Sequence, residues 1–80
     1  MRQVKSLAQI VLETGEDEYR RQRDSGGDPY LGAKCTVDKP TGARGEIWAF
    51  WIDRHEVGVS LKDGRRTIED ASNVFPLEVR

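Results

Sequence analysis

The sequence predicts a mostly β fold, a five-stranded small barrel with an N-terminal helix. Three observations lead to this fold class. The chain has 80 residues, which is enough for one domain. Apolar residues in its first part recur at helical spacing, whereas from Tyr30 onward short apolar segments alternate with turn-forming residues. We therefore expect a helical arm over residues 1–23, a linker loop over residues 24–32 and a barrel over residues 33–80.

The helix is predicted over residues 3–13 from the spacing of its apolar side chains. At about 100° per residue these side chains cover an arc of roughly 200°, and polar residues occupy the opposite side. Such a wide arc exceeds what one shallow contact needs, so we expect the helix to lie in a groove or between the barrel and a second surface. The apolar positions are Val4, Leu7, Ala8, Ile10, Val11 and Leu12.

Gly15 leaves two alternatives for the chain that follows this helix. Thr14 can cap a second helical segment, with Asp17 three residues further on as a weak capping box. Alternatively the helix continues through Gly15 at a cost of about 1 kcal/mol. In that case Tyr19 falls on the apolar side of the helix.

The charged residues after Gly15 are ordered with acids first and bases last. This order suits the helix dipole and allows Glu16 to pair with Arg20 one turn later. We interpret Arg20, Arg21 and Arg23 as a solvated last turn rather than a phosphate contact. The loop over residues 24–29 ends the helix and lacks the features of a phosphate-binding loop.

Short strands separated by turn residues make up the second half of the chain. Pro40 and Gly42 mark one reversal, and Asp63-Gly64 marks a tight hairpin because such a turn needs positive φ angles. Residues 70–73 suggest a single helical turn, and Pro76 indicates a closing edge strand. The expected strands cover residues 34–37, 45–54, 55–61, 66–69 and 74–79.

Glycines and apolar residues occupy fixed points of this layout. They are Cys35-Thr-Val37, Gly42, Gly45, Ile47, Val57-Gly-Val59, Asp63-Gly64 and Phe75-Pro-Leu-Glu78. The pattern resembles the SH3-like small barrels, including KOW and Tudor-type modules, and covers residues 31–80. In those families a Gly two residues before an apolar position opens the long second strand, and the last strand follows a one-turn helix. A KOW-like module would bind nucleic acid.

A narrower likeness concerns the long strand. Gly45-Glu-Ile-Trp-Ala-Phe-Trp51 is similar to a strand of the type II dihydrofolate reductases, which are SH3-like tetramers. This likeness would imply a reductase. Thr67-Ile-Glu-Asp70 departs from their active-site Val-Gln-Ile-Tyr motif, and the departure argues against both the pore and the reductase activity.

The stretch from Gly45 to Arg54 holds both tryptophans and one of the two phenylalanines. Alternation along a strand predicts an inner face and an outer face. The expected inner residues are Ile47, Ala49 and Trp51, and the expected outer residues are Trp48, Phe50 and Ile52. Three large apolar side chains on an outer face need a cover, which is either the N-terminal helix or a second molecule.

The outer aromatic residues are therefore the candidate contacts for a partner. We expect Trp48 and Phe50 to form the centre of the interface, with Arg44 and Arg54 at its rim, because tryptophan and arginine often carry interface energy. A nucleic acid would use the same aromatic rings for base stacking. The chain has 13 Lys and Arg against 14 Asp and Glu, so nucleic acid is not favoured by charge.

The sequence offers little for catalysis. Cys35 is the only cysteine and His55 the only histidine. We expect Cys35 to be a buried structural residue and His55 to lie in a surface turn. The sequence predicts no catalytic, cofactor-binding or metal-binding residue, and so no enzyme, cofactor or metal. Neither a membrane span nor a secretion signal is expected, and a single thiol suits the cytoplasm.

These observations predict a non-catalytic interaction module that binds a protein partner or self-associates through its aromatic face. The alternatives are a KOW-like nucleic-acid-binding module and a type II dihydrofolate reductase-like enzyme.

Overall fold

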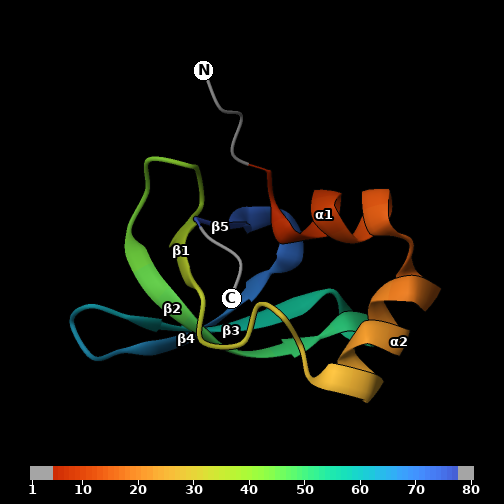
Figure 1. The fold of residues 1–80 in the computed structure, drawn as a ribbon. Coiled ribbons are helices and arrows are strands. Elements are labelled where there is room, and N and C mark those ends of the chain that lie inside the picture. Colours follow the sequence, from red (N-terminus) through yellow and green to blue (C-terminus); the bar gives the residue numbers. More distant parts are fainter. Residues whose placement is uncertain (1–4, 78–80) are drawn as a thin grey trace.

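Two helices precede a five-stranded antiparallel sheet in the computed structural model, which describes residues 5–77 (Figure 1). The predicted fold class, mostly β with an N-terminal helix, is confirmed. The helices are α1 (Leu7–Thr14) and α2 (Glu16–Gly26). The strands are β1 (Lys34–Val37), β2 (Arg44–Trp51), β3 (Glu56–Leu61), β4 (Arg66–Asp70) and β5 (Val74–Pro76). Two short 3-10 helices, η1 (Ile52–Arg54) and η2 (Ala71–Asn73), follow β2 and β4.

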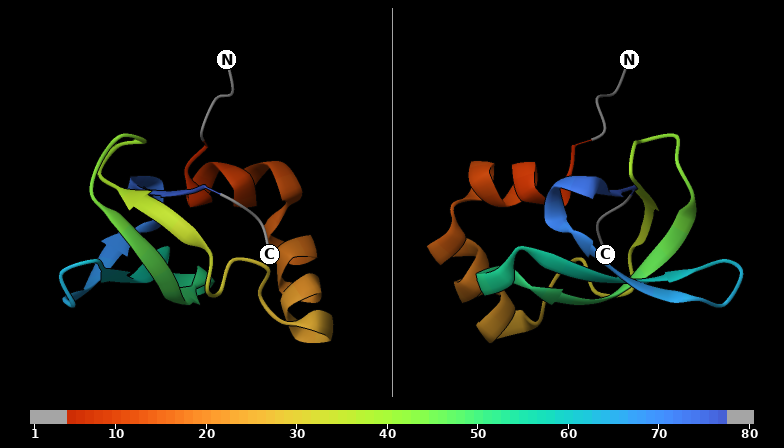
Figure 2. Two further views of the ribbon diagram at one scale, coloured as in Figure 1. Left: turned by 60° about the vertical axis from the view of Figure 1, so that its left-hand side comes forward. Right: turned by 180° about the vertical axis from the view of Figure 1, so that it is seen from behind.

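The strands are arranged in the order β4-β3-β2-β1-β5. The first four strands form a meander, and β5 returns to pair with β1, with Val74 opposite Val37. Within residues 5–77 the two outer strands, β4 and β5, do not pair with each other, so the sheet curls without closing. Figure 2 shows both helices on one side of the molecule and the β3–β4 turn projecting on the opposite side.

Gly15 separates the two helices instead of being included in one. Its backbone has φ 92° and ψ 131°, which is outside the helical region. Its N–H donates to the Val11 carbonyl at 2.8 Å, and its carbonyl accepts from the Tyr19 N–H at 2.9 Å. Gly15 therefore ends α1 and begins α2. Both expected alternatives are wrong, because the helix does not run through Gly15 and Thr14 is not the N-cap.

The first helix starts later than the sequence indicated. Ser6 caps α1 by accepting a hydrogen bond from the Gln9 N–H at 3.1 Å. Residues 3 and 4 of the predicted helix lie outside the described residues. Leu7 and Val11 are buried, whereas Leu12 is 77% exposed, so the wide apolar arc is only partly covered.

Both helices contribute to the hydrophobic core of the sheet. Leu7, Val11 and Tyr19 belong to the same buried cluster as the strand residues. α1 packs against η2 and β5. In α2, Glu16 and Arg20 form the expected ion pair at 2.7 Å. The strand residues of this cluster include Cys35, Val37, Ile47, Val57, Val59 and Val74.

Tyr19 attaches α2 to the sheet. Its ring stacks on Tyr30 at a centroid distance of 6.2 Å and meets Phe50 edge-on at 5.5 Å. Its hydroxyl donates to the Asp28 carboxylate at 2.5 Å, and the same carboxylate oxygen accepts from the Tyr30 N–H at 2.9 Å. Burial, followed by the Asp28 carboxylate, raises the pKa of Tyr19 far above its ordinary value. These contacts fix both α2 and the loop that follows it.

Candidate interaction surface

A β-bulge at Trp48 decides which side chains of β2 face the core. Ile47 lies opposite Val59, and Ala49 lies opposite Gly58, so Trp48 is an extra residue on β2. Trp48 and Ala49 then share the outer side of the sheet above Gly58. An extra residue reverses the alternation of faces beyond it.

The expected faces of the long strand are correct before the bulge and wrong after it. Ile47 is buried and Trp48 points outward, as predicted. Phe50 was expected outside but lies opposite buried Val57 and contacts Tyr19 of α2. Ile52 is likewise buried, because β2 ends at Trp51 and the predicted strand residues 52–54 form η1.

Trp51 lies on the outer side of the sheet with Trp48, although we predicted from the sequence that it would face the core. The two rings meet edge-on, with their centroids 5.5 Å apart and their planes 87° apart. The guanidinium carbon of Arg66 lies 5.4 Å from the centroid of the Trp48 ring, within cation–π range. Trp48 is nevertheless 40% exposed.

Apolar side chains flank Trp48 on both sides. Gly58 lies opposite Ile68, which is 49% exposed on β4. Leu31 is 44% exposed on the loop before β1. This loop lies beside β2, because the Gly32 N–H donates to the Ile47 carbonyl at 2.7 Å. We call the apolar side chains on the outer side around Trp48 the aromatic face. They are the exposed residues Leu31, Trp48 and Ile68 and the partly buried Trp51.

A groove of about 370 Å³ lies between the aromatic face and the end of α2. Arg23 and Asp28 place opposite charges along it. Its lining residues are Arg23, Gly27, Asp28, Leu31, Trp48, Ala49, Phe50 and Trp51. The Asp28 carboxylate has a fixed position in this groove because it accepts hydrogen bonds from the Tyr19 hydroxyl and the Tyr30 N–H.

The structure brings together two of the four predicted partner-binding residues. Trp48 and Phe50 both line the groove, although Phe50 does so from the core side of β2. Arg54 lies exposed at the end of η1, and Arg44 lines a different cavity. The arginines beside the tryptophans are Arg23 and Arg66, neither of which was predicted at the rim of the protein interface.

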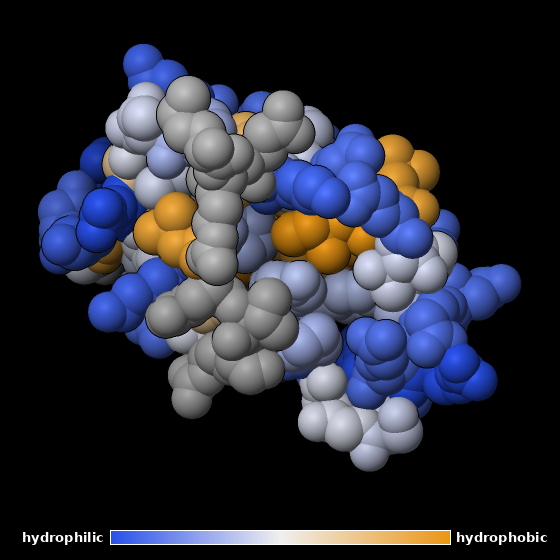
Figure 3. Space-filling view, turned by 45° about the horizontal axis from the view of Figure 1, so that its top comes forward, coloured by the Kyte–Doolittle hydropathy of each residue, from blue (hydrophilic) through white to orange (hydrophobic). Residues whose placement is uncertain are grey.

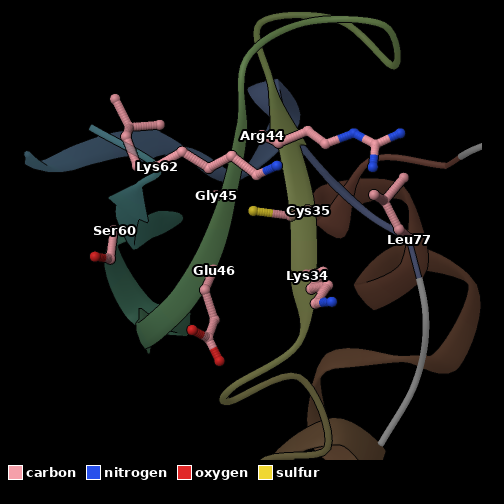
Figure 4. A pocket seen from close by; sticks show the side chains of 9 residues that line it. Lys34, Cys35, Arg44, Gly45, Glu46, Ser60, Lys62 and Leu77 are labelled. Carbon is pink, nitrogen blue, oxygen red and sulfur yellow. The ribbon is translucent and has the colours of Figure 1, made fainter. Parts of the chain in front are cut away.

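The second cavity has a volume of about 260 Å³ and lies between β1, β2 and β3 (Figure 4). Lys34, Arg44 and Lys62 line it together with one acid, Glu46. Cys35 also lines this cavity and is buried, as the sequence predicts. Burial raises the pKa of the Cys35 thiol to about 11, so the thiol stays protonated near neutral pH.

Figure 3 shows the molecule with the top of Figure 1 turned forward, where apolar side chains lie in separate patches among hydrophilic ones. His55 lies in an exposed left-handed turn with φ 54°, in agreement with the predicted surface turn. Among residues 5–77 no cluster of three or more His, Cys, Asp or Glu side chains could hold a metal ion. None of the helices in that range is long and apolar enough to cross a membrane.

Comparisons of the chain with protein-family models, curated proteins and solved structures find no match.

Proposed function

We propose that this protein is a non-catalytic interaction module that binds a protein partner through its aromatic face. The observation that carries the proposal is Trp48, a large apolar ring that remains 40% exposed although Trp51 and Arg66 hold it in place. Tryptophan and arginine are enriched among residues that dominate binding energy. Leu31 and Ile68 extend the apolar surface beyond the ring.

The groove beside Trp48 supports a partner that inserts an apolar side chain. Trp48, Trp51 and Leu31 provide apolar walls, and Arg23 and Asp28 provide polar contacts at the margin. A small apolar pocket with a few placed polar groups is the usual form of an anchor site. The strand order with β5 beside β1, and the short helix before β5, support a place among the SH3-like small barrels. The buried single thiol suits a reducing, cytoplasmic compartment.

Affinity capture from the native cell tests this proposal. The baits are the wild type, Trp48→Ala and Leu12→Ala; Leu12 is a matched control because it is an exposed apolar residue on α1. We expect one protein to be retained by the wild type and Leu12→Ala and to be lost with Trp48→Ala. Circular dichroism must show that all three baits are folded. Identical sets of captured proteins for the three baits would contradict the proposal.

A second candidate function is the binding of nucleic acid at the cavity that Lys34, Arg44 and Lys62 line. Three cations around one cavity could contact successive phosphates. Residues 33–80 nevertheless hold eight Lys and Arg and eight Asp and Glu, which places this function second. Retention on single-stranded DNA that weakens with salt, and weakens again in Arg44→Ala but not in Lys39→Ala, would favour it. Absence of retention at low salt would remove it.

A further inference from the structure

β4 is an edge strand whose outward backbone groups can be identified. Among residues 5–77, β4 pairs with β3 alone. At one end of this ladder the Leu61 N–H donates to the Arg65 carbonyl at 2.7 Å. At the other end the Ala71 N–H donates to the His55 carbonyl at 2.8 Å. Hydrogen-bonded and non-hydrogen-bonded pairs alternate in an antiparallel ladder, so these two bonds fix the pattern between them.

The pattern assigns every second residue of β4 to the open edge. Thr67 and Glu69 direct their N–H and carbonyl groups toward β3, since they lie two residues from the bonded residues Arg65 and Ala71, respectively. Arg66, Ile68 and Asp70 direct theirs away from β3. The side chains of these three residues also share one face of the sheet. It is the outer face, where Arg66 contacts Trp48 and Ile68 is 49% exposed.

The three outward residues make the edge of β4 complementary to the edge of β4 in a second copy of the chain. Arg66 lies two residues before Ile68, and Asp70 lies two residues after it. We propose that β4 pairs antiparallel with β4 of a second copy of this chain, around a two-fold axis at Ile68. In this register each Arg66 lies opposite an Asp70 of the other copy, and the two Ile68 side chains meet. The open-edge groups of both strands then face each other and can form about six ladder hydrogen bonds.

The charges at this edge fit such a contact. Neither Arg66 nor Asp70 forms an ion pair among the described residues. Asp70 uses Oδ1 to accept from the Ser72 N–H at 2.9 Å and the Ser72 hydroxyl at 2.7 Å, which leaves Oδ2 for the second copy. Opposite charges directly across a ladder stabilise it, whereas like charges destabilise it.

The other edge of the sheet is less suited to pairing. β5 spans only Val74–Pro76, and Pro76 has no backbone N–H to donate. Charged residues on an edge strand can also serve to prevent pairing. On β4, however, the two charged residues, Arg66 and Asp70, have opposite signs and lie at equal distances from Ile68. This arrangement favours pairing with a second copy rather than preventing it.

The expected dimer is weak, since a five-residue pairing buries less surface than a standard interface; we expect a dissociation constant in the range of about 10 µM to 1 mM. Dimerisation would place two aromatic faces on the same side of one continuous sheet. The inference concerns β4 alone and holds whether or not the aromatic face binds a protein partner.

Sedimentation of the wild type from about 10 µM to 1 mM is the first measurement, with a reversible monomer–dimer equilibrium as the expected result. Arg66→Asp and Asp70→Arg should each weaken the dimer by at least about tenfold, because each places like charges together at both symmetric pairs. An equimolar mixture of the two variants should recover the dimer, because every pair across the mixed interface is again of opposite charge.

A wild type that is monomeric up to about 1 mM would overturn the proposal, and so would single variants that dimerise as the wild type does. A mixture that dimerises no better than its components would also overturn it. Asp70→Arg removes the cap of η2, so its folding must be confirmed by circular dichroism.

Ile68→Lys provides a second test that does not alter this cap. It places two ammonium groups at the two-fold axis and should abolish the dimer. Leu12→Lys, a similar change on α1, should leave the dimer unaffected. Trp48→Ala should also dimerise, which separates a failure of this proposal from a failure of partner binding.

Discussion

The ring of Trp48 covers Gly58 on the neighbouring strand so closely that no side chain fits between them. A Cβ atom at residue 58 would lie 2.6 Å from the Trp48 ring. The bulge on β2 and the glycine on β3 are therefore two parts of one arrangement. Together they hold the tryptophan ring against β3, where the guanidinium carbon of Arg66 lies 5.4 Å from the ring centroid.

Gly58→Ala should displace the Trp48 ring and destabilise the fold by about 1–3 kcal/mol, as other overpacked sites do. Urea denaturation gives the free energy of unfolding, and near-UV circular dichroism reports the loss of a fixed tryptophan environment. Gly26→Ala is the matched control, because no atom lies within 4 Å of a Cβ at that position. Equal effects of the two substitutions would contradict the role assigned to Gly58.

The sequence was sufficient to locate most of the strands. β1 occupies the predicted residues 34–37, and Gly64 in the predicted hairpin has φ 94°. Alternation and turn residues are local signals, and these elements depend on local signals. The bulge does not depend on a local signal, since no residue next to Trp48 in the sequence indicates that Trp48 is the extra residue of β2. It depends on Gly58, ten residues further along the chain and on another strand.

The candidate surface was only partly predictable for the same reason. Trp48 was identified because a large apolar ring on an outer face is visible in the sequence pattern. Phe50 was assigned to the wrong face because the bulge reverses the alternation. Arg66 reaches Trp48 across two strand pairings, and Arg23 reaches the groove from the last turn of α2, so neither contact has a local signature.

Tyr19→Phe should lower the free energy of unfolding by about 1–2 kcal/mol, because it removes a half-buried hydrogen bond to Asp28. Tyr30→Phe is the control. The Tyr30 ring stacks on Tyr19, but its hydroxyl forms no hydrogen bond among the described residues. Chemical denaturation of both variants measures the difference. A loss in Tyr30→Phe as large as that in Tyr19→Phe would show that packing, not the hydrogen bond, carries the effect.

The stability of the fold should decrease in acid partly through Asp70. Hydrogen bonds from the Ser72 side chain and backbone lower the pKa of Asp70 below its ordinary value of 3.8. A carboxylate with a lowered pKa stabilises the fold above that ordinary value, and the contribution is lost as the pH falls through the folded-state pKa. The stability difference between the wild type and Asp70→Asn should therefore shrink as the pH falls below about 4. Thermal unfolding from pH 7 to pH 2 would show it, and a constant difference would contradict it.

Cys35 should be unreactive in the folded protein. The thiol is buried, and burial raises its pKa to about 11, so little thiolate forms at pH 8. A thiol-specific reagent should react with Cys35 only after unfolding in urea. Leu12→Cys, which introduces a second thiol at an exposed position, should react at once in the folded state. Rapid modification of the folded wild type would show that the cavity beside β1 opens to solvent.

Arg66 should shield Trp48 from solvent. Its guanidinium carbon lies 5.4 Å from the centroid of the Trp48 ring, so Arg66 covers part of the ring surface that Gly58 leaves open. In a Trp51→Phe background, where Trp48 is the only tryptophan, Arg66→Ala should increase quenching of the fluorescence by acrylamide. Arg65→Ala is the matched control, since Arg65 pairs with Asp63 at 2.7 Å in the hairpin turn. Equal quenching in both variants would mean that the arginine does not stay over the ring in solution. Trp48 would then be an even more open surface for a partner than its exposure indicates.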